Sequence, residues 1–318
     1  MSNDLESLGA PLRELRARFE AEVEPHRPAL WRYCLRLTGS AWDAEDLVQD
    51  VMERALARLS KLWQPVNTRA YLYRVATNAW IDRRRREVRS ELHHCEAAVV
   101  DHAVNSGEVR AAAHEAIEHV VHSLSPLQRV VFLLCDTFDF PAKDVATLLR
   151  TTEGAVKAAL HRARTSLASD GDGIRSRAHL VQSSDLDETV RRYIAAFDAR
   201  DADAIAALLH EDAVAVVVGS AIEVGRDMIR ANSLAEWASE PEPQRACAGV
   251  LDGREVLFVF AAQESGREAL HTIIELDIAG DVVMEQRNYY FSPDLLEYAA
   301  GALGIPAANH GYQYAFSG

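Results

Sequence analysis

The chain has 318 residues, of which 48% are hydrophobic and 26% charged, and its formal net charge is −14. This length predicts two or three domains, and the composition is typical of a globular protein. No apolar run reaches the ~20 residues that a membrane span requires, and the N-terminus lacks the pattern of a signal peptide. We therefore expect a cytoplasmic protein with no membrane partner.

The acidic excess is confined to the second part of the chain. From Asp170 onward there are 11 Lys and Arg against 25 Asp and Glu, out of totals of 34 and 48. The residues before Asp170 are therefore balanced in charge. Such asymmetry predicts separate domains with different partners.

The cysteine and histidine positions do not predict a metal site. The four cysteines are scattered without CxxC spacing, which indicates reduced thiols. The stretch 93–102 contains three histidines and Cys95, but the spacing of a four-ligand site is missing. We expect neither a metal nor another cofactor.

Helical spacing of apolar residues dominates the chain up to about Leu167. Repeats at i, i+3, i+4 and i+7 predict helices over 30–37, 47–59 and 72–79, followed by a polar linker. A Ser, Pro and Gln at 125, 126 and 128 then predict a helix start with a capping box. The inner face of that helix is expected to carry Leu127, Val130, Val131 and Leu134.

After a second linker, rich in Ser, Asp and Gly, the pattern changes to mixed helix and strand. Helices are expected over 190–197, 205–209 and 293–303. Strand-like runs cover 214–218, 255–262, 269–278 and 282–291. This order predicts an α+β domain.

An acidic, amide-bearing stripe follows the second predicted helix. Its members lie three or four residues apart, so they share one helix face opposite the apolar one. They are Asp46, Gln49, Asp50 and Glu53. The stripe suits a basic protein partner, and a merely solvated outer face is the alternative.

Aromatic and basic residues alternate on the third predicted helix. With the apolar positions of 72–79 buried, they would project along two neighbouring sides of the helix. They are Tyr71, Tyr73, Arg74, Asn78, Trp80, Arg84 and Arg85. Aromatic rings accept the faces of unpaired bases, at ~1–3 kcal/mol each, and guanidinium groups hold phosphates. Core aromatics beside an exposed basic helix end are the alternative.

A helix-turn-helix is predicted over 140–167. A short first helix precedes a turn, and Thr152 is a good N-cap for the second helix. The second helix is expected to bury Val156, Leu160, Ala163 and Leu167. Its outer side, suited to a major groove, carries Thr152, Glu153, Lys157, His161 and Arg164.

Three ordered stretches, 43–50, 70–86 and 124–167, resemble regions 2 and 4 of the extracytoplasmic-function (ECF) subfamily of sigma-70 RNA polymerase sigma factors. The run Thr151-Thr-Glu-Gly-Ala-Val-Lys-Ala-Ala-Leu-His-Arg-Ala-Arg164 is very similar to the recognition-helix motif of that family. The resemblance extends from roughly Leu30 to Leu167. Three ordered matches are more specific than any one of them.

The resemblance implies partners and roles. Core RNA polymerase and promoter DNA would be the partners, and no catalysis is expected of this chain. The stripe of Asp46, Gln49, Asp50 and Glu53 would dock on the clamp helices of the polymerase. The aromatic and basic residues of 71–85 would open and hold the −10 element. The residues from Thr152 to Arg164 on the second helix would read the −35 element.

Two positions depart from the family pattern. Arg150 stands where the family commonly has Gly, and a positive φ there would cost ~1 kcal/mol relative to Gly. Pro141 stands where the family tends to have a Ser-like cap, and Pro is acceptable at a first helical position.

The C-terminal part resembles the SnoaL-like members of the NTF2-like superfamily, with paired helices and a curved sheet around a pocket. The resemblance rests on the element order and on 187–218. It implies regulation of the sigma module, through a small ligand or an intramolecular contact, although a Trp-Leu-Pro-Glu-Pro linker motif and a Gly-rich Lys-containing motif are missing. His210, Asp212 and His271 are available in it, but catalysis is not expected.

The expected fold is multidomain: two all-α sigma modules, a region 2 helical bundle and a region 4 helix-turn-helix, precede an α+β NTF2-like domain with a curved sheet. The expected boundaries are 1–90, linker 91–110, 111–169, linker 170–184 and 185–318. Promoter-specific transcription initiation is the expected function. An ordinary helix-turn-helix regulator, or a ligand sensor that uses the C-terminal pocket, is the alternative.

Overall fold

The computed structural model describes residues 18–59, 67–94, 124–167, 178–181, 186–263 and 266–313. The chain divides into two compact units, Met1–Ile174 and Arg175–Gly318, and each has its own core. The expected linkers 91–110 and 170–184 lie largely outside the described residues.

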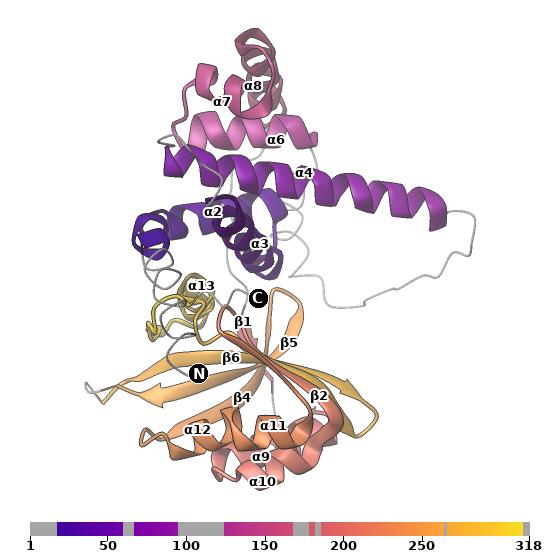
Figure 1. Cartoon of the computed structure of the whole chain (residues 1–318), viewed down its shortest axis with the longest axis vertical. Coiled ribbons are helices and arrows are strands. Elements are labelled where there is room, and N and C mark those ends of the chain that lie inside the picture. The colour runs from indigo at the N-terminus through magenta and orange to yellow at the C-terminus, as the bar shows by residue number, and fades with distance from the viewer. Residues whose placement is uncertain are drawn as a thin grey trace, which may run out of the picture. The chain divides into compact units, whose positions relative to one another are not determined.

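In the first unit, α2 (Arg27–Thr38), α3 (Ala41–Leu59) and α4 (Thr68–His94) form a helical bundle (Figure 1). A 3-10 turn, η1 (Glu24–His26), leads into α2. Gly39 ends α2 with a φ of 80°, a conformation that costs glycine little. The fully buried side chains of the bundle include Leu30, Tyr33, Leu37, Val48, Val51, Leu72 and Ala76.

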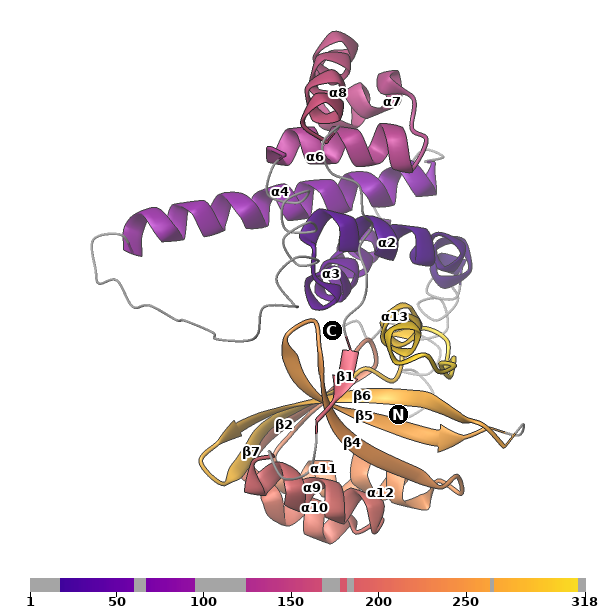
Figure 2. The same cartoon turned by 180° about the vertical axis from the view of Figure 1, so that it is seen from behind.

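Helix α4 is longer than its apolar repeat predicts and is the long helix in Figure 2. The repeat ends at Ala79, but the helix continues to His94. Residues 83–92 contain no Gly or Pro and are mainly Arg and Glu, which favour a helix even without an apolar face.

Four helical elements lie between residues 124 and 167 of the first unit. They are α6 (Pro126–Phe132), the π-helical turn η2 (Leu133–Thr137), α7 (Ala142–Leu149) and α8 (Glu153–Leu167). The predicted capping box is confirmed: the Gln128 N–H donates to Ser125 Oγ, and the Ser125 N–H donates to Gln128 Oε1. The prediction that Leu127 lies on the inner face was wrong, since its side chain is 47% exposed. The apolar repeat that includes Leu127 extends beyond the part of the helix surface that other residues cover.

The predicted helix-turn-helix is formed by α7 and α8. Arg150 ends α7 with a φ of 53°, so the left-handed position anticipated there is present. The Ala155 N–H donates to Thr152 Oγ1 at 3.1 Å, which confirms the predicted cap of α8. Pro141 stands at the N-cap of α7, the position where the family tends to have a Ser-like cap; its backbone is extended and its side chain makes no capping hydrogen bond.

The second unit is built on a seven-stranded sheet in the order β1-β4-β5-β6-β7-β2-β3. All neighbours are antiparallel except β2 and β7. The strands are β1 (Ala178–Leu180), β2 (Leu209–Val217), β3 (Ala221–Val224), β4 (Gln244–Leu251), β5 (Arg254–Ala262), β6 (Glu268–Ala279) and β7 (Val282–Asn288). The α+β fold with a curved sheet is thus confirmed.

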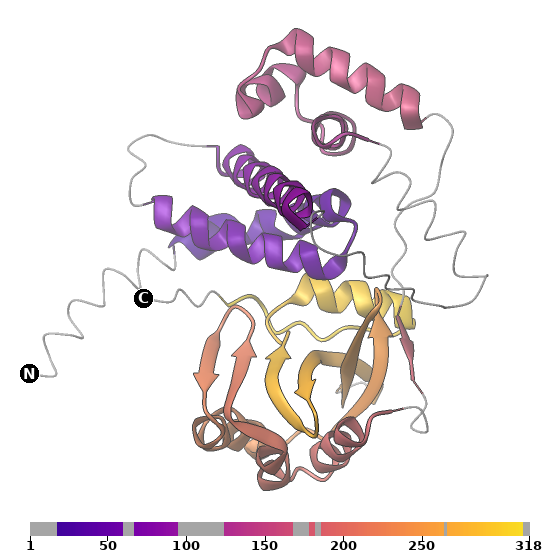
Figure 3. The ribbon, with the colours of Figure 1, turned by 90° about the vertical axis from the view of Figure 1, so that its right-hand side faces the viewer.

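Helices cover both sides of this sheet (Figure 3). One side carries α9 (Glu188–Asp198), α10 (Ala202–Leu208), α11 (Arg226–Ala231) and α12 (Ser233–Ser239). The other side carries α13 (Pro293–Leu303). The core beneath the first set combines Tyr193 and Phe197 of α9 with Leu257, Val259 and Val283 of the sheet.

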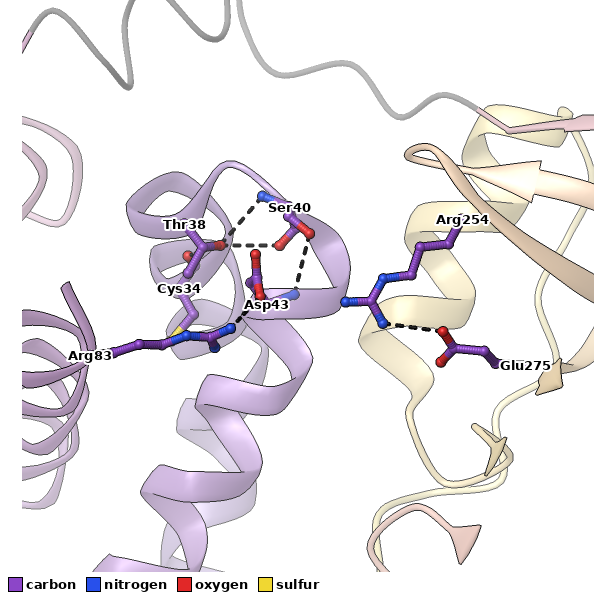
Figure 4. A network of polar contacts seen from close by, with 7 residues as sticks. All are labelled: Cys34, Thr38, Ser40, Asp43, Arg83, Arg254 and Glu275. Atoms are coloured by element: carbon purple, nitrogen blue, oxygen red, sulfur yellow. Dashed lines mark hydrogen bonds and ion pairs between the residues drawn. The ribbon is translucent and has the colours of Figure 1, made fainter. Parts of the chain in front are cut away.

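Strands β1, β3 and β4 and helices α11 and α12 were not expected from the sequence. At β4, Gly249 allows β1 to lie close, because a Cβ there would come within 2.6 Å of the His179 carbonyl oxygen. On the opposite edge of β5, Arg254 pairs with Glu275 of β6 at 3.3 Å (Figure 4), and Glu275 also accepts from the Tyr289 hydroxyl.

Candidate nucleic-acid and partner interfaces

The acidic stripe lies on the outer face of α3. Asp46, Asp50 and Glu53 are exposed, whereas Gln49 is half-buried and donates to Glu45 Oε1 at 2.9 Å. Glu45 is itself buried, where it accepts hydrogen bonds from Arg27 at 3.1 Å and from the Trp31 indole at 2.9 Å. The buried ion pair therefore orients the Gln49 amide at the border of an exposed acidic face.

A polar network fixes the start of α3 (Figure 4). Thr38 Oγ1 donates to the carbonyl oxygens of Cys34 and Ser40, and the Asp43 N–H donates to Ser40 Oγ. Arg83 of α4 then pairs with the Asp43 carboxylate at 2.7 Å. The acidic face of α3 and the basic part of α4 are thereby held in one fixed geometry.

The structure separates the candidate residues of α4 into two groups. The side chains of Arg74, Asn78, Arg84 and Arg85 are exposed, as a DNA-binding surface requires. The rings of Tyr71, Tyr73 and Trp80 are buried instead, with at most 6% of their surface exposed. In this conformation the three rings are therefore packed inside the protein and are not accessible to a base.

Tyr73 is enclosed by residues from the segment that precedes α7. Its ring centroid lies 5.4 Å from that of Phe138 and 5.0 Å from that of Phe140. Arg69 contacts both phenylalanines. Its Nη2 donates to the Phe138 carbonyl at 2.6 Å, and its guanidinium lies 4.6 Å from the Phe140 ring centroid. Burial raises the pKa of the Tyr73 hydroxyl to about 12, although the nearby Arg69 opposes that rise.

Trp80 is covered in a similar way by Arg129 of α6. The Arg129 guanidinium lies 5.3 Å from the Trp80 ring centroid and donates to the Leu37 carbonyl at 2.9 Å. Burial, followed by repulsion from Arg84, lowers the pKa of Arg129 to about 10. Arg129 thus joins α6 to α2 through the Leu37 carbonyl and to α4 through the Trp80 ring.

Helix α8 presents all five of its candidate residues to solvent. Thr152, Glu153, Lys157, His161 and Arg164 are exposed. Its buried side consists of Val156, Ala159 and Ala163. Leu160 was expected inside but is only partly buried, because the small Ala159 takes the inner position against the neighbouring helices, and the side chain of Leu167 is not among those described.

Two basic side chains of α8 form ion pairs with carboxylates. Lys157 pairs with Glu153 at 2.6 Å, one helical turn away. Arg164 makes a bidentate pair with Asp136 of η2, at 2.7 Å from Nε and 2.6 Å from Nη2. Asp136 thus accepts both hydrogen bonds that the Arg164 guanidinium could otherwise donate to a guanine or a phosphate.

The second unit contains a cavity of about 750 Å³ between the sheet and the helices α9, α10 and α12. His271 of β6 is buried in its wall, whereas His210 and Asp212 of β2 contact one another and do not line it. The Gln244 amide connects three side chains of the cavity wall. Gln244 Oε1 accepts from Trp237 Nε1, and Gln244 Nε2 donates to Glu240 and to His271 Nε2. Burial lowers the pKa of His271 to about 4.

Sequence reasoning missed Asp136, Arg69, Arg129, Phe138 and Phe140, all of which contact a predicted site residue. Phe138 and Phe140 stand in the segment between two predicted helices, and two aromatic residues there were a signal of buried contact. The pairing of Asp136 with Arg164 had no local signal, since the two are 28 residues apart.

No group of three or more metal-ligating side chains was found among the described residues. Within the same ranges, no helix is both long and apolar enough to cross a bilayer.

The fold and these surfaces define a class: a multidomain protein whose helical module combines an exposed acidic helix face with a helix-turn-helix, followed by an α+β domain. Three family models match in that order. Residues 23–90 match Sigma-70 region 2, residues 114–167 match Sigma-70, region 4, and residues 190–275 match a SnoaL-like domain.

Several relatives are similar to about half of the chain or more. SigG of Mycobacterium tuberculosis, an ECF RNA polymerase sigma factor, is 31% identical over 64% of this chain and 62% of SigG, so the chain spans less than two thirds of that relative. SigL of the same species, another ECF sigma factor, is 33% identical over 48% of this chain and 87% of SigL. The crystal structure of SigJ, an extracytoplasmic function sigma factor of Mycobacterium tuberculosis, matches with a TM-score of 0.32 and 22% sequence identity. The match covers 84% of this chain and 95% of the SigJ chain.

The chain belongs to the ECF subfamily of RNA polymerase sigma factors. It is an ECF sigma factor with a SnoaL-like C-terminal domain, as the resemblance noted in the sequence predicts.

Proposed function

We propose that this chain directs promoter-specific transcription initiation by core RNA polymerase. The observation that carries the proposal is that region 2 and region 4 occur in order in one chain, each with an exposed polar surface of the required kind. The acidic stripe of α3 suits a protein partner, and the outer side of α8 suits a major groove.

In this proposal, the polymerase docks on Asp46, Gln49, Asp50 and Glu53. Three of these side chains are exposed on one face, and the fourth is held at its border by Glu45. Complementary charge accelerates and orients such an encounter.

Helix α4 would bind the −10 element after the two halves of the unit have separated. Arg74, Asn78, Arg84 and Arg85 are accessible already and would hold phosphates or base edges. Tyr73 and Trp80 become available for stacking only when Phe138, Phe140 and Arg129 move away, and we assign that separation to docking on the polymerase. Tyr71, also buried, would follow the same change. Promoter melting is then favoured because unpaired bases are bound by the newly exposed rings.

Helix α8 would read the −35 element as duplex DNA. Lys157, His161 and Arg164 provide donors at successive turns, and Thr152 and Glu153 stand at the N-terminal end, where a recognition helix contacts base edges. For Arg164 to bind DNA, the guanidinium must leave Asp136.

The C-terminal domain would regulate the sigma module and would not catalyse a reaction. Its acidic excess supports the regulatory role, because it can compete with phosphates for basic surfaces. We propose working boundaries of 1–90 and 111–169 for the sigma modules and 185–318 for this domain.

The test is a reconstitution with purified core polymerase that lacks any sigma subunit. The full chain, and a version truncated after Arg177, should each support initiation from a defined promoter, and with different activities. Initiation by neither form would reject the sigma function. Equal activity of the two would reject the regulatory role. Specific DNA binding without polymerase-dependent initiation would favour an ordinary helix-turn-helix regulator.

A further inference from the structure

The cavity of the C-terminal domain has the size and lining of a ligand site. Its volume of about 750 Å³ is within the range of pockets that enclose small organic molecules. Its apolar part is formed by Phe197, Ile205, Leu234, Trp237 and Ile274. The Trp237 and Phe197 rings pack with centroids 4.6 Å apart, so they form one continuous aromatic wall.

The charged groups of this cavity are all acidic. Glu223, Glu236 and Glu240 line it, and no lysine or arginine of the described chain does. Its two histidines add no positive charge at neutral pH, because burial lowers the pKa of both His271 and His310. The described lining of the cavity therefore contributes a net negative charge at neutral pH.

Arg200 offsets that negative charge only in part, because its single positive charge acts against the three carboxylates of the lining. Arg200 lies 5.5 Å from the Trp237 ring centroid, but its guanidinium donates to the backbone carbonyls of Trp237 and Glu242 outside the cavity lining. Glu242 adds a further carboxylate at the same place. Among the described residues the Glu236 carboxylate has no hydrogen-bond or ion-pair partner, so it remains available to a ligand.

We propose that this cavity binds an apolar organic cation, an amine whose hydrocarbon part lies on the Trp237 and Phe197 wall and whose ammonium group lies between Glu236 and Glu240. An ammonium ion is attracted both by carboxylates and by the face of an indole or phenol ring. Tyr290, stacked on His310 at 3.6 Å, provides a second ring on the cavity wall. Burial raises the pKa of Glu240; the hydrogen bond from Gln244 and the charge of Arg200 oppose that rise, whereas the carboxylates of Glu236 and Glu242 reinforce it.

The proposal predicts a rank order for three probes that differ only in their head group. Binding of 4-phenylbutylamine, 4-phenylbutanol and 4-phenylbutyrate to the full chain is measured by calorimetry at neutral pH. The amine should bind about tenfold or more tightly than the alcohol, and the carboxylate most weakly. Equal or tighter binding of the alcohol or the carboxylate, or no measurable binding of the amine, would overturn the proposal.

A pair of matched double variants places the cation within the cavity. E236Q/E240Q removes two cavity carboxylates and should reduce the affinity for the amine about tenfold without changing that for the alcohol. E255Q/E297Q removes two exposed carboxylates of the same domain outside the cavity, and its affinity for the amine should equal that of the unmodified chain. The same loss in both doubles would mean that the amine binds through net charge alone and would contradict the assignment. Because the probe series needs only the unmodified chain, misfolding of a variant leaves that test intact.

Discussion

The ring of Tyr73 in α4 lies 5.0 Å, centroid to centroid, from that of Phe140, 67 positions later in the chain. This contact joins the helix that carries the candidate −10 residues to the segment that leads into the helix-turn-helix. Tyr33 and Phe138 complete the cluster, with centroids 5.4 Å apart. The aromatic residues proposed to capture unpaired bases thus contribute, in this conformation, to the internal packing of the first unit.

Replacing Phe138 by alanine should therefore weaken the packing of the whole unit. Removing a buried phenyl ring costs about 3 kcal/mol or more in the free energy of unfolding, and hydrogen exchange along α4 near Tyr73 should accelerate. Urea denaturation and hydrogen exchange measure the two effects. Leu127→Ala, at an exposed apolar position of α6, is the control and should cost less than about 1 kcal/mol. Unchanged exchange in Phe138→Ala would argue against the cluster.

The local features of the fold were predictable because they depend on neighbours in sequence. The Ser125 capping box, the Thr152 cap and the position of α13 follow from residue types at fixed short spacings. Strand β4 was missed because its sequence, QRACAGVL, is rich in small residues, and Gly249 reads as a turn although it accommodates the close approach of β1.

The candidate site was predictable in its composition and not in its exposure. The acidic face of α3 needs only helical periodicity, and it is present as expected. The burial of Tyr73 and Trp80 depends on Phe140 and Arg129, which no local pattern connects to α4. Helical periodicity identifies the face on which a ring stands, but contacts that are distant in sequence decide whether solvent reaches it.

Arg150 offers a test of backbone strain at the helix-turn-helix. Its φ of 53° is unfavourable for a residue with a Cβ, so Arg150→Gly should raise the free energy of unfolding by about 1 kcal/mol. The same change at Arg162, in the interior of α8, should lower it by about 1 kcal/mol, since glycine disfavours a helix. Both values come from chemical denaturation. A decrease for both variants would show that the Arg150 side chain contributes more than the strain costs.

Asp136 is expected to restrain DNA binding by holding Arg164. With Asp136→Asn the bidentate ion pair is lost, and the holoenzyme should bind promoter DNA several-fold more tightly. One more phosphate contact would also steepen the dependence of log affinity on log salt by about one unit. Asp144→Asn, which removes an exposed carboxylate of α7, is the control for net charge. Equal changes in both variants would show that the loss of one negative charge, and not the release of Arg164, accounts for the tighter binding.

The acidic stripe of α3 gives a direct test of polymerase docking. The double variant Asp46→Ala/Asp50→Ala should bind core polymerase about tenfold more weakly, with most of the loss in the association rate at low salt. Asp82→Ala removes an exposed carboxylate of α4 and should leave that affinity unchanged. Wild-type affinity in the double variant would remove α3 from the proposed interface.

His271 should make the stability of the C-terminal domain depend on pH. Burial lowers its pKa in the folded state from 6.5 to about 4, so the unfolded chain binds a proton more readily than the folded one does. The stability that the neutral ring maintains is complete above the unfolded pKa and is lost as the pH falls from about 6.5 toward 4. A single group of this kind lowers the free energy of unfolding by about 2 kcal/mol between pH 7 and pH 5.

Urea unfolding at pH 7, 6 and 5, followed by hydrogen exchange in β5 and β6, measures this dependence on pH. His271→Gln serves as the comparison, because it keeps a polar side chain beside Gln244 but cannot take up a proton in this range. The slope attributable to His271 should be missing from the variant. Parallel pH profiles for the two proteins would show that other groups, such as His310 or the acidic residues of the domain, account for the loss of stability.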